Sequence, residues 1–212
     1  MFIMYNIISR GDKMSILDSK SKVECFKKEM SYIKNKEYLE DYETLINLLP
    51  DYFFTVAASS TGKYHPEFSL GDGGLLRHTK AAVRIAYELL NDPCIGDKYT
   101  SREKDLMLIA LTMHDGVKHG IPEDKYTKAE HPLLASNLIE ENKEKLKMSD
   151  EDIQFMRKVI ESHMGPWNTH PYTKEEILPV PKTKYEHFVH MCDYLASRRF
   201  LEVKFVDNEI DE

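Results

Sequence analysis

The feature that most constrains the fold is an apolar run that ends in two ionisable side chains. Residues 106–118 read Leu-Met-Leu-Ile-Ala-Leu-Thr-Met-His-Asp-Gly-Val-Lys. An almost uninterrupted apolar run predicts a helix that is buried on all sides, and Gly116 predicts its end. Burying the ring of His114 and the carboxylate of Asp115 at the end of such a helix is costly unless each has a partner. A bound metal ion is one such partner, so we expect the chemistry of this protein at this doublet.

Composition fits one domain, or one domain with an extension. The 212 residues are 42% hydrophobic and 31% charged, which is enough for a real core under a polar surface. Three widely spaced cysteines suggest neither a disulfide framework nor a thiolate zinc site, and we expect a reducing, cytoplasmic location. The apolar start is too short for a signal peptide, and no run approaches the roughly 18 apolar residues of a membrane helix. We therefore expect no membrane association.

The net charge of −7 bears on the partners of this chain. An acidic balance argues against a broad nucleic-acid-binding surface, because the phosphate backbone is bound mainly by clustered basic residues. It still admits a nucleotide, or a short single strand, in a locally basic pocket.

Helical periodicity runs through most of the chain and predicts an all-α fold. From about residue 17 to 49, apolar residues three to four apart indicate one or two amphipathic helices, which Pro50 ends. Further helices are expected after Gly74, after an N-cap at Ser101, from His131-Pro132, after a cap at Ser149, and from about Lys184 to Phe200. We expect a helical bundle over residues 51–200, an N-terminal helical extension over residues 1–50 that packs on it, and an acidic tail over residues 201–212 that is frayed from residue 207 to 212.

Six polar residues fall on the inward faces or at the ends of these predicted helices: His78, His114, Asp115, His131, His163 and Asp193. Each alone fits a hydrogen-bonded core residue or a paired carboxylate. All six on successive helices favour one metal centre instead. Imidazole and carboxylate ligands without cysteine suit Mn²⁺, Fe²⁺, Co²⁺, Ni²⁺ or Zn²⁺. We expect a divalent transition metal at this centre.

Five further residues are candidates for substrate binding: Lys63, His65, Arg77, Trp167 and Arg198. Lys63 and His65 lie in a polar loop whose Gly-Lys pair lacks the first glycine and the Ser/Thr of a phosphate-binding loop, which excludes a P-loop NTPase. The alternatives are a plain turn for this loop and a solvated surface charge for Arg77. Trp167 could stack a base or serve as a core or lid aromatic. Arg198 could clamp a phosphate or be ordinary surface charge.

The order of these ligand types resembles the HD-domain metal-dependent phosphohydrolase superfamily, whose pattern is H…HD…D. The first ligand matches His78, the doublet matches residues 114–115, and the last matches Asp193. His131 and His163 occupy the positions of the extra histidines in two-metal members, so the resemblance favours two ions over one. The segment of residues 73–79, Gly-Gly-Leu-Leu-Arg-His-Thr, is similar to that around the first histidine in the 3′→5′ exoribonuclease branch, with Arg where Glu is usual. The resemblance covers about residues 50–200 and implies an HD-domain helical bundle.

This resemblance also implies an activity. Lys118 aligns with the phosphate-contacting lysine of the family, and Asp115 is the carboxylate expected to bridge two cations. The implied enzyme cleaves a phosphomonoester or phosphodiester bond in a nucleotide or short nucleic acid with a metal-activated hydroxide, while Lys118 stabilises charge on the phosphoryl oxygens. Two alternatives stay open: a di-iron oxygenase of a small organic substrate, and a nucleotide-binding protein without turnover. A homo-oligomer is an open alternative to a monomer.

Overall fold

The structure is a computed structural model that describes residues 18–59, 62, 65–201 and 203–211. Over these residues the fold is mostly α-helical, with nine helices, three short 3₁₀ turns and one two-stranded hairpin. The prediction of an all-α fold is confirmed. Within the same ranges, no helix combines the length and the apolar character needed to cross a membrane.

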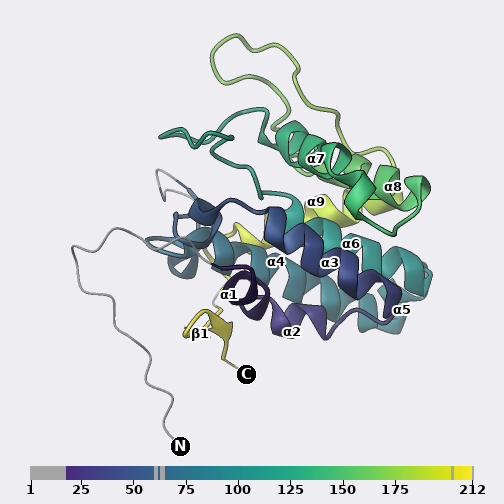
Figure 1. The fold of residues 1–212 in the computed structure, drawn as a ribbon. Coiled ribbons are helices and arrows are strands. Elements are labelled where there is room, and N and C mark those ends of the chain that lie inside the picture. Colours follow the sequence, from purple (N-terminus) through teal and green to yellow (C-terminus); the bar gives the residue numbers. More distant parts are fainter. Residues whose placement is uncertain (1–17, 60–61, 63–64, 202, 212) are drawn as a thin grey trace, which may run out of the picture.

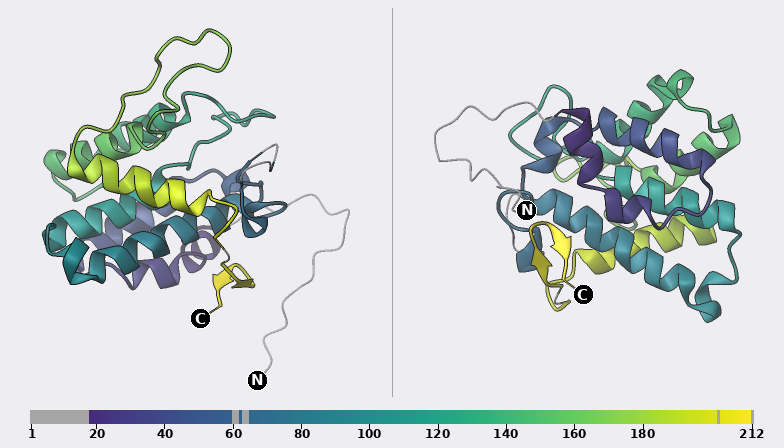
Figure 2. Two further views of the ribbon diagram at one scale, coloured as in Figure 1. Left: turned by 180° about the vertical axis from the view of Figure 1, so that it is seen from behind. Right: turned by 60° about the horizontal axis from the view of Figure 1, so that its bottom comes forward.

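The bundle that carries the site is built from five helices: α4 (Gly74–Asn91), α6 (Ser101–Met113), α7 (His131–Glu141), α8 (Asp150–Glu161) and α9 (Lys184–Ala196). α6 runs through the middle and packs against α4, α8 and α9, while α7 packs on α8 (Figures 1 and 2). Two long connections, between α6 and α7 and between α8 and α9, leave the bundle on one side (Figure 1). The site described below lies at this side, where α6 ends.

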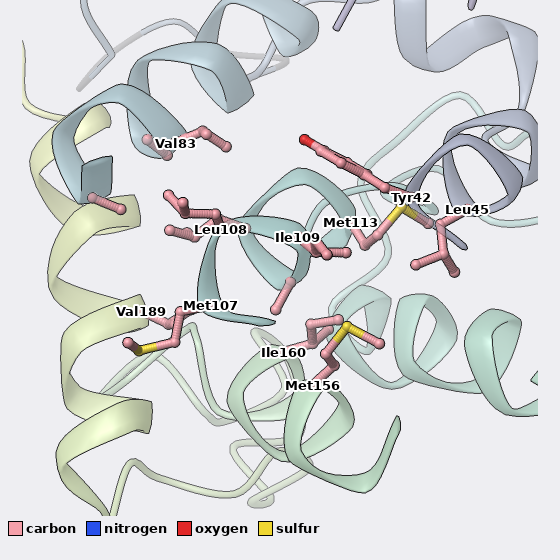
Figure 3. Close-up of a cluster of buried hydrophobic side chains, with 14 of the residues drawn as sticks. Tyr42, Leu45, Val83, Met107, Leu108, Ile109, Met113, Met156, Ile160 and Val189 are labelled. Atoms are coloured by element: carbon pink, nitrogen blue, oxygen red, sulfur yellow. The ribbon is translucent and has the colours of Figure 1, made fainter. Parts of the chain in front are cut away.

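The apolar part of α6 is completely buried, as its sequence predicts, whereas residues 101–104 of its first turn are exposed or partly exposed. Every residue from Asp105 to Met113 is buried. Apolar side chains of the neighbouring helices surround α6 on several sides, among them Tyr42, Val83, Met156 and Val189 (Figure 3). Burial of one Leu or Ile side chain stabilises the fold by about 1.5–3 kcal/mol. This packing therefore holds the C-terminal end of α6 in a defined place.

The N-terminal segment forms three helical pieces rather than the one or two that were predicted: α1 (Ser19–Glu24), α2 (Lys27–Met30) and α3 (Glu37–Leu48). Phe26 leaves helical geometry between α1 and α2, with φ −112° and ψ 14°, and its ring is fully buried in the core. The turn before α3 is held by Asp105, whose carboxylate accepts the backbone N–H groups of Lys34 and Asn35. α3 ends before Pro50, as predicted.

Several helix boundaries follow local capping chemistry. The predicted cap at Ser149 and the start of α7 at His131 are confirmed. The cap of α6 is Thr100 rather than Ser101, because the Thr100 hydroxyl accepts from the backbone of Glu103 in a capping box. A short helix, α5 (Pro93–Gly96), occupies the predicted loop before α6, and α9 ends at Ala196, four residues before the expected end at Phe200.

The prediction of a frayed tail is wrong for the described part of residues 207–212. β1 (Phe205–Val206) and β2 (Glu209–Ile210) pair in an antiparallel hairpin, on the opposite side of the molecule from the α8–α9 connection (Figure 2). The carboxylate of Glu209 lies 2.7 Å from the ammonium of Lys80, which is fully buried on α4 and also pairs with Glu29 at 3.0 Å. A buried ammonium requires such partners, which explains why this polar segment is ordered.

Candidate metal centre

The six predicted ligands come from five helices or their ends and meet beside the C-terminal end of α6. His78 lies on α4, His114 caps α6 with Asp115 next to it, and His131 begins α7. His163 lies in the turn just after α8, and Asp193 lies on α9. The five residues other than Asp193 are each at most 2% exposed. Segments up to 115 residues apart in sequence thus supply one buried cluster.

One part of the cluster faces His78. Its Nε2 lies 3.0 Å from Oδ1 of Asp193, and Nε2 of His114 lies 3.4 Å from the same oxygen. The Oδ2 atom of Asp115 lies 3.7 Å from His78 Nε2 and 3.6 Å from His114 Nε2. Two imidazoles and two carboxylates therefore converge at distances that a single cation can span.

The other part of the cluster faces α7 and α8. Oδ1 of Asp115 lies 2.9 Å from Nε2 of His131 and 3.7 Å from Nε2 of His163, and these two nitrogens are 3.3 Å apart. The two oxygens of Asp115 thus point to different histidine pairs. Two overlapping triads, one with His78, His114 and Asp193 and one with His114, Asp115 and His163, could hold metal ions.

Backbone carbonyls orient three of the rings. Nδ1 of His114 lies 2.6 Å from the carbonyl of Leu111, Nδ1 of His131 lies 2.8 Å from that of Lys128, and Nδ1 of His163 lies 2.7 Å from that of Ile160. Each carbonyl is three residues before its histidine. A proton donated from Nδ1 leaves the lone pair on Nε2, so these bonds aim the ligand nitrogen into the cluster, as outer hydrogen bonds do at metal sites.

The protonation of the two carboxylates and of His163 suits cation binding, whereas for His114 the effect of burial is outweighed by Asp115 and Asp193, which raise its pKa. Burial opposes ionisation, but the charges of Lys118 and His114 hold the pKa of Asp115 well below its usual value. Burial likewise opposes ionisation of Asp193, and the neighbouring rings of His114 and His78 lower its pKa. Burial lowers the pKa of His163, which favours the neutral, ligating imidazole. Both carboxylates are therefore anionic at neutral pH.

Two buried ligand atoms lie close to other groups of the cluster but form no hydrogen bond with them. Among the described residues, neither Nε2 of His114 nor Oδ1 of Asp115 has a hydrogen-bond partner. A buried polar atom without a partner costs about 1–3 kcal/mol. Both atoms point into the cluster, where a cation would satisfy them. The donor set of imidazole and carboxylate thus fits a divalent transition metal.

Lys118 lies against the cluster. Its Nζ is 2.5 Å from Oδ2 of Asp115, and its backbone N–H donates to the carbonyl of Asp115 across one turn. The side chain is 12% exposed, so its ammonium stands between the buried carboxylate and the open cavity. It is the cation closest to the cluster in the described part of the chain.

A cavity of about 370 Å³ opens from the cluster. His65, Trp167 and Arg198, three of the predicted substrate residues, line it together with the metal-site residues and Lys118. Burial, together with the nearby His78 and Lys118, lowers the pKa of His65 to about 4, so this ring is neutral at physiological pH. The cavity is thus lined by the charged groups of the cluster and Lys118 and by the uncharged ring of His65.

The structure does not bring Arg77 to this cavity. Its guanidinium donates to the carbonyls of Phe68 and Leu70, at 2.5 and 2.9 Å, and to Asn208 in the hairpin at 2.8 Å. Arg77 thus braces the loop before α4, because it lies one position from His78 and so points to another side of the helix. Lys63 lies outside the described residues.

Among the lining residues that sequence reasoning missed are two aromatic side chains of α9, His190 and Tyr194. Together with Trp167 they form what we call the aromatic wall. Trp167 stacks on Tyr194 with ring centroids 5.7 Å apart and planes 11° apart, and His190 lies 6.2 Å from Trp167. The spacing of three residues between His190 and Asp193 was a usable signal, because such residues share a helix face. No comparable feature of the sequence indicated that Tyr194 would line the cavity.

Comparisons with known proteins add no information about this site. No protein-family model, curated protein or solved structure matches this chain. What the structure itself establishes is a mostly helical fold with a buried His/Asp cluster that could hold a metal.

Proposed function

We propose that this protein is an HD-domain metal-dependent phosphohydrolase that cleaves a phosphate ester of a nucleotide or short nucleic acid. The observation that carries the proposal is the arrangement of Asp115, whose two oxygens lie toward two different histidine pairs. A carboxylate placed in this way can bridge two cations, as in two-metal hydrolysis. The order of ligands along a helical bundle, H…HD…D, supports the assignment to this superfamily.

Each residue then has a defined task. His78, His114 and Asp193 would hold one ion, His131 and His163 the other, and Asp115 both. When bound, such ions lower the pKa of coordinated water and neutralise charge on phosphoryl oxygens. Lys118 would bind a non-bridging phosphate oxygen, because its ammonium lies at the edge of the cluster and lines the cavity. Arg198, two residues after the end of α9 and in the lining of the same cavity, would bind phosphate or sugar oxygens.

The aromatic wall supports a substrate with a planar ring. Trp167 is 53% exposed although it lines the cavity, which leaves ring surface available to a ligand. Tyr194 supports Trp167 from behind, and the guanidinium carbon of Arg198 lies 4.2 Å from the centroid of the Tyr194 ring. A nucleobase stacked on Trp167 would place its phosphate toward the charged groups of the cluster and Lys118. This arrangement fits a single nucleotide or the end of a short strand.

One experiment separates this function from its rivals. Metal content per chain is measured on purified protein, and phosphate release is measured with a panel of nucleotides, cyclic nucleotides and short oligonucleotides. We expect two transition-metal ions and metal-dependent turnover of at least one phosphate ester. Iron together with O₂ uptake and no phosphate release would favour an oxygenase that uses the same ligands. A nucleotide retained without hydrolysis in metal-replete protein would favour a binding protein.

The part of the cluster that faces His78 (the His78 half) and the part that faces α7 and α8 (the α7–α8 half) are expected to lose their metal ions separately. His131→Ala or His163→Ala should reduce the metal content from two ions to one, because the His78 half keeps its own ligands. His78→Ala is the matched comparison and should leave the α7–α8 half occupied. Metal titration followed by anomalous scattering measures both. A single ion in metal-replete wild-type protein, with His131 and His163 turned away, would contradict the two-metal arrangement.

Trp167→Ala is expected to raise KM for base-containing substrates with little effect on kcat. Stacking on an aromatic side chain is worth about 1–3 kcal/mol per base, which corresponds to roughly 5- to 150-fold in KM. A substrate without a base, such as bis(p-nitrophenyl) phosphate, should be affected much less. Tyr172→Ala is the control, since Tyr172 lies in the same connection and is 88% exposed. Equal losses for both substrates would contradict base stacking.

A further inference from the structure

His163 differs from the other histidines of the cluster in how its backbone is held. α8 ends at Glu161, and Ser162 already leaves helical geometry with φ −99° and ψ 1°. Two residues after His163, Gly165 adopts a left-handed conformation with φ +58°. His163 therefore lies in a turn between a helix end and a reversal of the chain, where few helical hydrogen bonds fix its position.

His190 reaches this turn from α9. Its Nδ1 lies 2.6 Å from the carbonyl oxygen of His163, a short hydrogen bond in which the ring donates. The ring also lies directly on Gly165, because a Cβ at that position would come within 2.3 Å of Cε1 of His190. The absence of a side chain at residue 165 thus lets the imidazole approach the backbone of a proposed metal ligand. The ring contact with Gly165 and the hydrogen bond to the carbonyl of His163 together hold the turn after α8 against α9.

The position of His190 on α9 links the two parts of the cluster. It lies three residues before Asp193, on the same face of one helix, and both residues line the cavity. α9 therefore supplies a ligand to the His78 half of the cluster and, through His190, a hydrogen bond to the backbone of a ligand in the other half. The spacing between the two halves depends on this helix.

We propose that His190 is a positioning residue that holds His163 in place for the second metal ion. The inference rests on the proposed two-metal function and adds to it a residue outside the ligand set. The hydrogen-bond donor at Nδ1 is the required property. Outer hydrogen bonds at metal sites commonly change metal affinity 10- to 100-fold when they are removed. The ring also contributes to the aromatic wall, so its two roles must be separated by the choice of variants.

Three substitutions separate the donor from the bulk of the ring. Asn places an amide N–H near the position of Nδ1, whereas Gln places it near that of Nε2, and Ala removes both. We expect His190→Ala and His190→Gln to weaken binding of the second Mn²⁺ ion 10- to 100-fold, with the first ion bound as in wild type. His190→Asn should stay within a few-fold of wild type. His187→Ala, an exposed histidine one turn earlier on α9, is the control and should bind both ions normally.

Calorimetric titration of metal-free protein with Mn²⁺ measures both affinities directly, and circular dichroism verifies that each variant is folded. The Asn and Gln variants test the role of the donor even if the Ala variant does not fold. Both keep an amide N–H, which lies near Nδ1 in one and near Nε2 in the other. Equal affinity of the Asn and Gln variants for the second ion would overturn the role of the donor. Two ions bound by His190→Ala as tightly as by wild type would overturn the inference alone. A single ion in wild-type protein would overturn the proposed function and the inference with it.

Discussion

Asp115→Ala is expected to remove both metal ions and all metal-dependent phosphate release. The substitution deletes the one side chain whose oxygens lie toward both histidine pairs, at 3.6–3.7 Å on one side and 2.9–3.7 Å on the other. Neither half then keeps more than one carboxylate, and the α7–α8 half keeps none. Metal content after dialysis, measured by elemental analysis, tests this expectation.

Two further variants test whether the charge of Asp115 is required and whether the loss of metal is specific to this position. Asp115→Asn keeps the size of the side chain but removes its charge, and we expect it to lose metal nearly as completely as the Ala variant. Asp124→Ala removes a carboxylate in the following connection that pairs with Lys128 and lies outside the cavity lining, so it should keep full metal content. Full occupancy in Asp115→Ala would show that the bridging role is wrong.

Lys118→Ala is expected to lower kcat by roughly 10²-fold or more, in line with the loss of one preorganised electrostatic stabiliser. Its ammonium lies 2.5 Å from Oδ2 of Asp115 and borders the cavity, within reach of a phosphoryl group at the cluster. The side chain makes no contribution to the apolar core, so the melting temperature should stay close to that of wild type. Steady-state kinetics with a phosphodiester substrate provides the measurement.

Metal content must be followed in the same experiment, because Lys118 lowers the pKa of Asp115. The rings of His114, His131 and His163 also lower this pKa and remain in the variant, so we expect its metal content to stay near that of wild type. Lys125→Ala, in the same connection, is the control. If Lys118→Ala hydrolyses every phosphate ester at the wild-type rate, the phosphohydrolase mechanism fails, and the oxygenase becomes the next function to test.

The helices themselves were predictable because the forces that define them act over a few residues. The apolar run of α6, the cap at Ser149 and the start of α7 at His131 are all recognised from neighbours within one or two turns. The error in the predicted start of α6 was one residue and had a local cause. Thr100 and Ser101 are both good caps, and only the geometry of the Glu103 capping box decides between them.

The ligand types were also predictable, since inward-facing histidines and aspartates on buried helices need partners whatever the fold. Their pairing was not predictable. Which oxygen of Asp115 lies toward His78 and which toward His131 depends on how α4, α7 and α9 pack around α6. The same packing brings His190 to the carbonyl of His163, 27 residues away in sequence.

Sequence by itself therefore determined the helices, the buried doublet at the end of α6 and the chemical type of the site. Only the tertiary structure decided which polar residues share the cavity. Arg77 is adjacent to His78 in sequence, yet its guanidinium holds the loop before α4 and the hairpin. Glu209 belongs to a tail that reads as frayed, yet it pairs with the buried Lys80. Side-chain direction on a helix and the partner of a buried charge depend on contacts between distant segments, and these exist only once the helices are packed.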